Sequence, residues 1–228
     1  MSSLDFEIKR KSVHLVSLTY LFLFTFVEFY FNYKIAIYFL TFLLIIHFFY
    51  EEIRLRKARN FFEKYFKKYT TKLNQFHRLH EQNSMSGSFY MLLGIVISLS
   101  IFNYNIAIAV ILMAIFGDLF AALVGKKFGK TKFLSKTLEG TTAGFLVNLI
   151  IAFIFLRGSF EIFGNSTLWN VLNNIFTNFN LLELNLYLIF AAAFFASFAE
   201  LYFENIDDNL SIPVFSGFFT FLIFIIFF

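Results

Sequence analysis

The sequence predicts an all-α protein: a polytopic membrane bundle of about seven transmembrane helices, formed by residues 1–228 as a single domain. Of the 228 residues, 59% are hydrophobic and 22% are aromatic, and the mean hydropathy is +0.71. A soluble domain of this length could not hide so much apolar surface. Apolar runs also recur at about the 20-residue length that a bilayer span requires. We therefore expect an integral, multi-pass membrane protein.

The apolar runs give the expected spans in order along the chain. They lie near residues 13–31, 34–50, 86–102, 105–125, 138–156, 183–200 and 211–228. The first run is too long for a signal peptide, and no small-residue cleavage site follows it. Pro213 suits the first turn of the last span, where a missing N–H is tolerated. The sequence has no cysteine, which excludes a disulfide framework, thiol catalysis and thiolate metal sites.

The basic residues predict the orientation. Of 19 Lys and Arg residues, three precede the first span, nine lie between the second and third, and five lie between the fourth and fifth. By the positive-inside rule, the N-terminus and the segments 51–85, 126–137 and 201–210 are then cytoplasmic. The membrane would be the cell membrane in a prokaryote or the endoplasmic reticulum membrane in a eukaryote. We expect no nucleic-acid partner.

Between Glu51 and Gln82 the pattern changes to that of an amphipathic helix. Aromatic and aliphatic side chains recur there at helical spacing, with Lys and Arg between them. Such a helix lies on an anionic membrane surface or over the cytoplasmic mouth of the bundle. Two roles stay open: membrane anchoring alone, or a rim over which a lipid substrate enters.

Asp118 is the first candidate site residue, because a carboxylate inside an apolar span is costly to bury. Ala121, Ala122 and Gly125 follow it at i+3, i+4 and i+7, so its face of the helix is lined by small residues. Such a face allows a neighbouring helix or a ligand to approach closely. Near the cytoplasmic mouth, this carboxylate could bind Mg²⁺ together with phosphates and water. The alternative is a packing hydrogen bond to another helix.

The loop after this span is basic and contains Gly125 and Gly129 for close backbone approach. Most of its lysines can be explained by the positive-inside rule alone. Lys136 differs because it directly precedes Thr137-Leu138-Glu139-Gly140-Thr141, where the next apolar span begins. Thr137 is a plausible N-cap, and the free N–H groups of the first turn form an anion site. Glu139 suits the helix dipole, or it faces Asp118 as a second metal ligand or a general base.

Two further clusters lie on the same predicted side. Arg10, Lys11 and His14 lead into the first span, and together they suggest phosphate binding or proton transfer. Glu200 closes the sixth span, and Asp207-Asp208-Asn209 precedes the seventh. An acidic patch on a basic face favours a metal site or a hydroxyl-activating site over a solvated loop.

These residues carry a family resemblance. The chain resembles the CTP-dependent membrane lipid kinases, which include dolichol kinase, phytol kinase and the CTP-dependent diacylglycerol kinase, and more distantly it resembles phosphatidate cytidylyltransferase. The matching pieces run in order over nearly the whole chain: Arg10-Lys11-x-x-His14, Ser86-Gly87 through Gly94, Gly117-Asp118-x-x-Ala121-Ala122-x-x-Gly125, Gly129-Lys130, Lys136 to Thr141, and Glu200…Asp207-Asp208-Asn209-x-x-x-Pro213. The block from Asp118 to Thr141 is shared with the cytidylyltransferases, whereas the Asp207 to Asn209 block separates the kinases from them.

The resemblance implies phosphoryl transfer from CTP to the hydroxyl of a membrane-embedded alcohol, with a divalent cation such as Mg²⁺. It implies metal ligation by Asp118, Glu139 and Asp207, and phosphate binding by Lys136, Lys130 and Arg10. Asp208 or Glu200 would orient the acceptor hydroxyl. The remaining residues implied at the nucleotide are Lys11, His14, Gly125, Gly129, Thr137, Gly140, Thr141 and Asn209.

Two alternatives remain from the sequence. One is a cytidylyltransferase that makes a CDP-lipid and pyrophosphate. The other is a transporter or channel that uses the intramembrane acids as an ion path, although the acids crowd one predicted face, with Glu28 near the other. The acceptor stays open among polyprenol, phytol-like or farnesol-like alcohols and diacylglycerol, because generic apolar side chains form its pocket. The oligomeric state also stays open.

Overall fold

The structure is a computed structural model, and it describes residues 15, 17–55, 84–134, 136–156, 186–203 and 206–227. The described residues are mostly helical, as predicted. The helices are α2 (Leu18–Tyr30), α3 (Tyr33–Leu55), α5 (Gly87–Ile101), α6 (Tyr104–Leu112), the π-helix η2 (Met113–Gly117), α7 (Asp118–Phe128), α8 (Leu138–Leu156), α10 (Leu186–Tyr202) and α11 (Asp208–Phe227). Two short strands, β1 (Lys132–Phe133) and β2 (Lys136–Thr137), form an antiparallel hairpin.

The membrane class rests on the length and composition of these helices. Within the described residues, four helical rods are long and apolar enough to cross a membrane: Tyr33–Leu55, Tyr104–Phe128, Leu138–Leu156 and Asp208–Phe227. The second of these is α6, η2 and α7 in one continuous rod. Helices α2, α5 and α10 are apolar but shorter. A helix lies in each of the seven predicted apolar runs, and whether all seven cross the bilayer stays a prediction.

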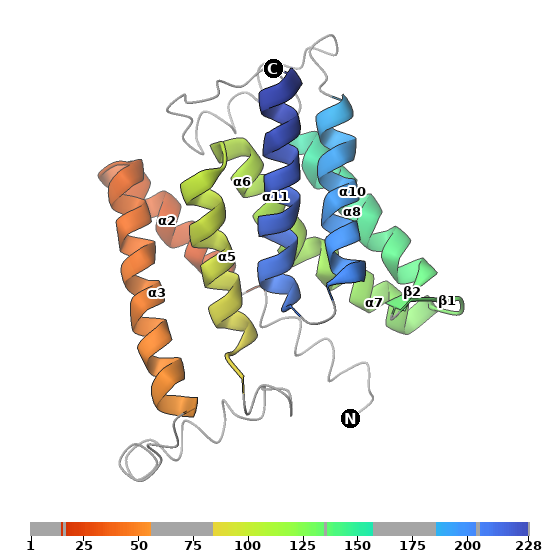
Figure 1. The fold of residues 1–228 in the computed structure, drawn as a ribbon, viewed down its shortest axis with the longest axis horizontal. Helices are drawn as coiled ribbons and strands as arrows, with labels where there is room; N and C mark the ends of the chain where they lie inside the picture. Colours follow the sequence, from red (N-terminus) through yellow and green to blue (C-terminus); the bar gives the residue numbers. More distant parts are fainter. Residues whose placement is uncertain are drawn as a thin grey trace.

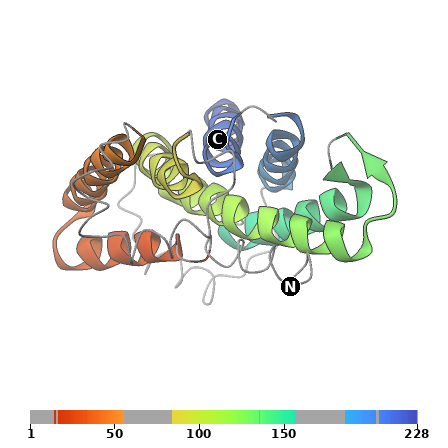
Figure 2. The ribbon, with the colours of Figure 1, turned by 90° about the horizontal axis from the view of Figure 1, so that it is seen from below.

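The helices form two layers. In Figure 1, α3, α5, α11 and α10 stand side by side, while α2, the α6–α7 rod and α8 run behind them at a slant. The view from below in Figure 2 shows the same two rows, with β1 and β2 at the far edge beside α7 and α8. The end of α10 and the start of α11 meet at the lower end of the bundle, as do the end of α3 and the start of α5.

The α6–α7 rod forms the centre of the core. From Ile106 to Ile115 nearly every side chain is buried, so α6 and η2 are covered on all sides by other helices. The outer helices instead expose large apolar side chains, such as Phe22 and Phe29 of α2 and Ile225 of α11. Apolar surface of this extent is expected where lipid is the solvent.

Two predicted boundaries differ from the structure. Helix α3 continues to Leu55, past the predicted end at residue 50, because Glu51 is buried by polar partners rather than exposed at a helix end. The predicted amphipathic helix of residues 51–82 therefore starts within α3, and its remainder falls in residues 56–83, outside the described residues.

Pro213 lies inside α11, not in its first turn, because the helix already begins at Asp208. A proline has no N–H, so it leaves the carbonyl of Asn209, four residues earlier, without its helical donor. Helix α5 packs closely at this point. A Cβ added to Gly94 would come within 2.8 Å of that carbonyl oxygen and 3.0 Å of the Pro213 ring, so only glycine allows this approach.

Candidate functional site

Lys136 lies at the centre of a cluster of charges drawn from separate parts of the chain. Its ammonium nitrogen lies 2.8 Å from Oε1 of Glu200, to which it donates a hydrogen bond, and 3.6 Å from Oδ2 of Asp208. Glu200 is almost fully buried near the end of α10, and Asp208 opens α11. The cluster therefore joins the hairpin to the junction between α10 and α11.

The β-hairpin positions Lys136. Phe133 pairs with Lys136 and Lys132 pairs with Thr137, while Leu134 turns the chain with a left-handed φ of 52°. The N–H of Leu138 donates to the carbonyl of Thr131 at 2.9 Å, which fastens the hairpin to the start of α8. Side chains alternate between the two faces of a strand. A short strand therefore directs the Lys136 side chain, where the sequence alone predicted an irregular loop.

The charge of Asp118 also acts on Lys136. Asp118 is the first residue of α7, directly after the π-helix, and only 6% of its surface is exposed. Burial alone would lower the pKa of Lys136, but the negative charges of Glu200, Asp208 and Asp118 raise this pKa above its usual value. Lys136 is therefore held as a cation by the carboxylates of Glu200 and Asp208, with a further contribution from the charge of Asp118.

A second polar contact lies one helical turn further into the bundle. Asn148 of α8 donates from Nδ2 to Oγ of Ser197 of α10 at 3.1 Å, and both residues are buried. Gly117, just before Asp118, packs against the Asn148 amide so closely that an added Cβ would meet Oδ1 at 2.1 Å. Gly144 packs less tightly: an added Cβ would lie 3.0 Å from the Ala121 Cβ and 3.4 Å from Oε2 of Glu200. Small residues thus bring α7, α8 and α10 together around the cluster.

The predicted N-cap is confirmed, and the glycines of the loop have a packing role. The hydroxyl of Thr137 accepts a hydrogen bond from the N–H of Gly140 at 3.3 Å, as an N-cap does. A Cβ on Gly125 or on Gly129 would lie 2.7–2.8 Å from this hydroxyl, and one on Gly140 would lie 2.7 Å from the Ala121 carbonyl. These glycines let α7 and α8 approach each other, and their contact with a nucleotide stays a prediction.

Glu139 has a backbone partner that the sequence did not predict. Its carboxylate accepts hydrogen bonds from the N–H of Thr131 at 3.1 and 3.3 Å, at the protein surface. The hairpin brings this donor to the first turn of α8. That Glu139 faces Asp118 as a second metal ligand or a general base stays a prediction.

Asp207 and Asn209 are occupied in starting α11. Oδ1 of Asp207 accepts from the backbone N–H of Asn209 at 3.0 Å and from its side-chain amide at 2.6 Å. The Asp207 carbonyl accepts from Leu210 and Ser211. Asp207 is thus the N-cap of the helix, and Asp208 is the acid of this loop that reaches Lys136.

The other predicted residues are placed as follows. Lys130 is exposed, and Thr141 is partly buried, with a hydroxyl that has no hydrogen-bond partner among the described residues. Arg10, Lys11 and His14 lie outside the described residues.

The metal stays a prediction. Across the described ranges, no three His, Asp or Glu side chains are grouped so that they could hold a metal ion by themselves. Magnesium in phosphotransfer sites is commonly held by one or two carboxylates together with substrate phosphates. The carboxylates of Asp118, Glu200 and Asp208 are donors of the right chemistry for such a shared site.

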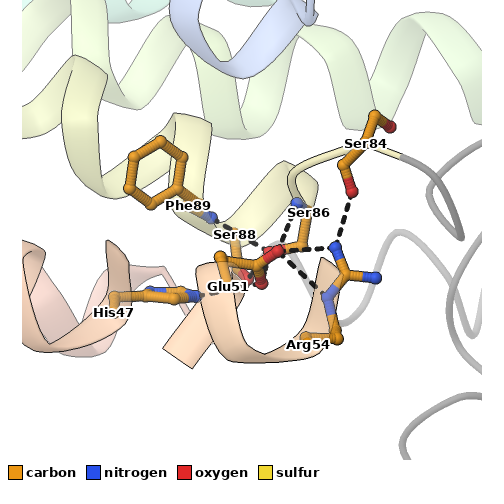
Figure 3. A network of polar contacts seen from close by, with 7 residues as sticks. All are labelled: His47, Glu51, Arg54, Ser84, Ser86, Ser88 and Phe89. Atoms are coloured by element: carbon orange, nitrogen blue, oxygen red, sulfur yellow. Dashed lines mark hydrogen bonds and ion pairs between the residues drawn. The ribbon is translucent and has the colours of Figure 1, made fainter. Parts of the chain in front are cut away.

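A further buried acid, Glu51, was not among the residues that the sequence suggested for the site. Glu51 of α3 accepts from Nε and Nη2 of Arg54 at 3.0 and 2.5 Å, and from the hydroxyl and N–H of Ser86 at 2.7 and 3.2 Å. Nε2 of His47 lies 3.7 Å away, and Arg54 also donates to the Ser84 carbonyl at 2.6 Å. Figure 3 shows this network joining α3 to the start of α5. Its signal in the sequence was the helical spacing of His47, Glu51 and Arg54 at the end of an apolar run.

Comparison with known proteins finds a relative over nearly the whole chain. The chain is similar to RP860, an uncharacterized protein of Rickettsia prowazekii (strain Madrid E), with 28% identity over 218 residues that cover 92% of this chain and 91% of that protein. No protein-family model matches the chain, and no solved structure matches it at a significant level. The function must therefore be argued from the site.

Proposed function

We propose that this protein is a CTP-dependent lipid kinase that phosphorylates the hydroxyl of a membrane-embedded alcohol. One observation carries the proposal: Asp118, Lys136, Glu200 and Asp208 are far apart in the sequence, yet the fold gathers their charges at one place. These four are among the five residues to which the family resemblance assigns chemistry, and Glu139 is the fifth. Clusters of charges that perturb one another are typical of functional sites.

The proposed reaction needs positioning and charge neutralisation more than covalent chemistry. The acceptor oxygen forms a bond to the γ-phosphorus while the bond from that phosphorus to the β–γ bridging oxygen breaks. CDP leaves with the electron pair of that bond, and the hydroxyl proton passes to a carboxylate. Glu200 or Asp208 is the proposed proton acceptor, and Lys136 neutralises charge on the phosphates. A bound Mg²⁺ would supply further neutralisation with Asp118 as its protein ligand.

The proposed membrane arrangement places this chemistry on the cytoplasmic side. All seven apolar helices would cross the bilayer, and the positive-inside rule would orient the hairpin and the junction of α10 and α11 toward the cytoplasm. CTP would then reach the cluster from water, while the alcohol would reach it from the bilayer. The chain of such a lipid is held in the membrane by about 0.8 kcal/mol per buried CH₂, so the acceptor must react at the membrane.

Product analysis tests the proposal against the alternative of a CDP-lipid-forming cytidylyltransferase, which the shared Asp118–Thr141 block also favours. The purified protein is incubated either with lipid alcohols or with lipid phosphates such as phosphatidate, and with CTP labelled either at the γ-phosphorus or at the α-phosphorus. A kinase transfers the γ-label to the lipid and releases CDP. A cytidylyltransferase needs a lipid phosphate, transfers the α-label and releases pyrophosphate. Transfer of neither label to any lipid would refute both readings.

A further inference from the structure

Asn148 carries a buried oxygen that no described residue satisfies. The residue is 1% exposed, and its Nδ2 donates to Ser197, but Oδ1 has no hydrogen-bond partner within the described part of the chain. A buried acceptor without a donor is costly, so native proteins rarely keep one without a reason. This acceptor lies deep in an apolar bundle, where water offers little compensation.

The position of this oxygen relates it to the cluster at Lys136. Asn148 lies four residues after Gly144 on α8, and an added Cβ on Gly144 would contact Oε2 of Glu200 at 3.4 Å. Oδ1 packs directly against Gly117, the residue before Asp118. Ser197, the partner of the amide, lies three residues before Glu200 on α10. The unsatisfied oxygen is thus about one helical turn, roughly 5.4 Å along α8, on the bundle side of the charges.

The hydrogen-bonding chemistry of this oxygen indicates which class of ligand could bind to it. A carbonyl oxygen only accepts hydrogen bonds, so it favours a group with an O–H or N–H to donate. A lipid alcohol that enters from the bilayer offers a single O–H at the end of an apolar chain. A lipid phosphate offers anionic acceptors, which a buried acceptor disfavours.

We propose that Asn148, held by Ser197, binds the acceptor hydroxyl and presents it to the charges at Asp118 and Glu200. This inference rests on the proposed kinase function and deepens it, since it makes a neutral alcohol the acceptor class. Asn148 is then a specificity residue, and the π-helix that ends at Gly117 helps to place its amide. Such π-helical turns occur frequently at functional sites.

Ligand binding without CTP tests this inference. The full-length protein in lipid nanodiscs is titrated with radiolabelled geranylgeraniol and with its O-methyl ether, which has the same chain but no donor. The wild type is expected to bind the alcohol about tenfold more tightly than the ether, because the ether leaves Oδ1 unsatisfied. Asn148→Leu, close in size but apolar, should reduce this ratio to about one.

Thr220→Val is the matched control. Thr220 of α11 is also fully buried, with a hydroxyl that lacks a hydrogen-bond partner among the described residues, but it lies twelve residues after Asp208 along α11. This variant should keep the tenfold preference. If Asn148→Leu does not fold, Ser197→Ala removes the anchor of the amide and should weaken the preference instead.

The outcomes separate the inference from the kinase proposal. Equal affinity of the wild type for alcohol and ether overturns the inference, as does a preference that survives in Asn148→Leu. If CTP transfers no label to lipid but the preference depends on Asn148, the hydroxyl site stands and the kinase assignment fails. If transfer occurs without any preference, the kinase assignment stands and the hydroxyl site fails.

Discussion

The ammonium of Lys136 donates a hydrogen bond of 2.8 Å to Glu200, a residue 64 positions later in the chain. The contact gives the buried carboxylate near the end of α10 a cationic partner from the two-residue strand β2. Such a pair is costly to form in an apolar environment, because both ions lose water. Its presence between two segments assigned to chemistry by their sequence makes it the first target for mutation.

Removal of the lysine charge should destabilise the protein. Lys136→Met leaves Glu200 without its cation, and the loss of one partner of a buried pair costs about 3 kcal/mol. Thermal unfolding in detergent should show a lower midpoint, and a second change, Glu200→Gln, should recover part of the loss. If the double variant is less stable than Lys136→Met alone, the pair does not hold α10 to the hairpin.

The direction in which the pKa of Lys136 is shifted determines how this residue affects stability as the pH changes. The carboxylates around Lys136 raise its folded-state pKa above that of the unfolded chain. Its contribution to stability is therefore complete below the usual lysine range and is lost as pH rises through the higher folded value. The thermal unfolding midpoint should therefore not change between pH 7 and 9 as a result of the titration of Lys136. A Lys136-dependent loss of stability within that window would contradict the direction of the shift.

Asp118→Asn should abolish turnover and leave the folded protein in the membrane, since it removes the charge with almost no change of shape. Activity is measured as transfer of label from CTP to lipid, and folding by size-exclusion chromatography in detergent. Lys127→Ala provides the control, because Lys127 is exposed and its ammonium lies over the neighbouring Phe128 ring in a cation–π interaction at 5.1 Å. Comparable losses in both variants would mean that the charges important for catalysis have been misassigned.

Activity should require a divalent cation and should prefer CTP to ATP, as expected from the resemblance of the Asp118–Thr141 block to CTP-using enzymes. Initial rates are compared with each nucleotide, with Mg²⁺ and with excess chelator. Full activity with ATP in the presence of chelator would exclude the proposed donor and the proposed metal together.

Glu51→Ala should destabilise the bundle by about 3 kcal/mol, because it leaves Arg54 and Ser86 without their shared acceptor. Thr41→Ala on the same helix is the control, since the Thr41 hydroxyl donates to the carbonyl of Ile37, one turn earlier on its own helix. The two variants are compared by thermal unfolding in detergent. Equal effects would show that the network in Figure 3 adds little to the joining of α3 and α5.

The sequence predicted the parts of the site that depend on residue type and helical spacing. Asp118, Lys136, Glu200 and Asp208 do lie together, because an apolar bundle leaves few places for charge. Contacts that depend on local backbone geometry could not be predicted. Glu139 bonds to Thr131 because a hairpin forms that no periodicity indicates. Asp207 caps α11 and thereby moves the helix start ahead of Pro213.

Glu51 was missed for a different reason. A charge at the end of an apolar run is typical of a span that has reached the membrane surface, and the partner Ser86 lies 35 residues away in the chain. The pairing of distant segments cannot be derived from the periodicity of either one.

The π-helix of Met113–Gly117 lies directly before Asp118 in the α6–α7 rod. A π-turn arises when one extra residue is accommodated within an α-helix, so the turns on either side of it keep their α-helical register. Deletion of one residue between Met113 and Gly117 would therefore convert this segment to regular α-helix and leave Asp118 on about the same face of the rod. Deletion of one residue from a regular α-helical part of the rod would instead rotate every residue beyond it by about 100°. A homologue with the same motif but one residue fewer in this segment should therefore have a regular helix here and still direct its acid toward the cluster.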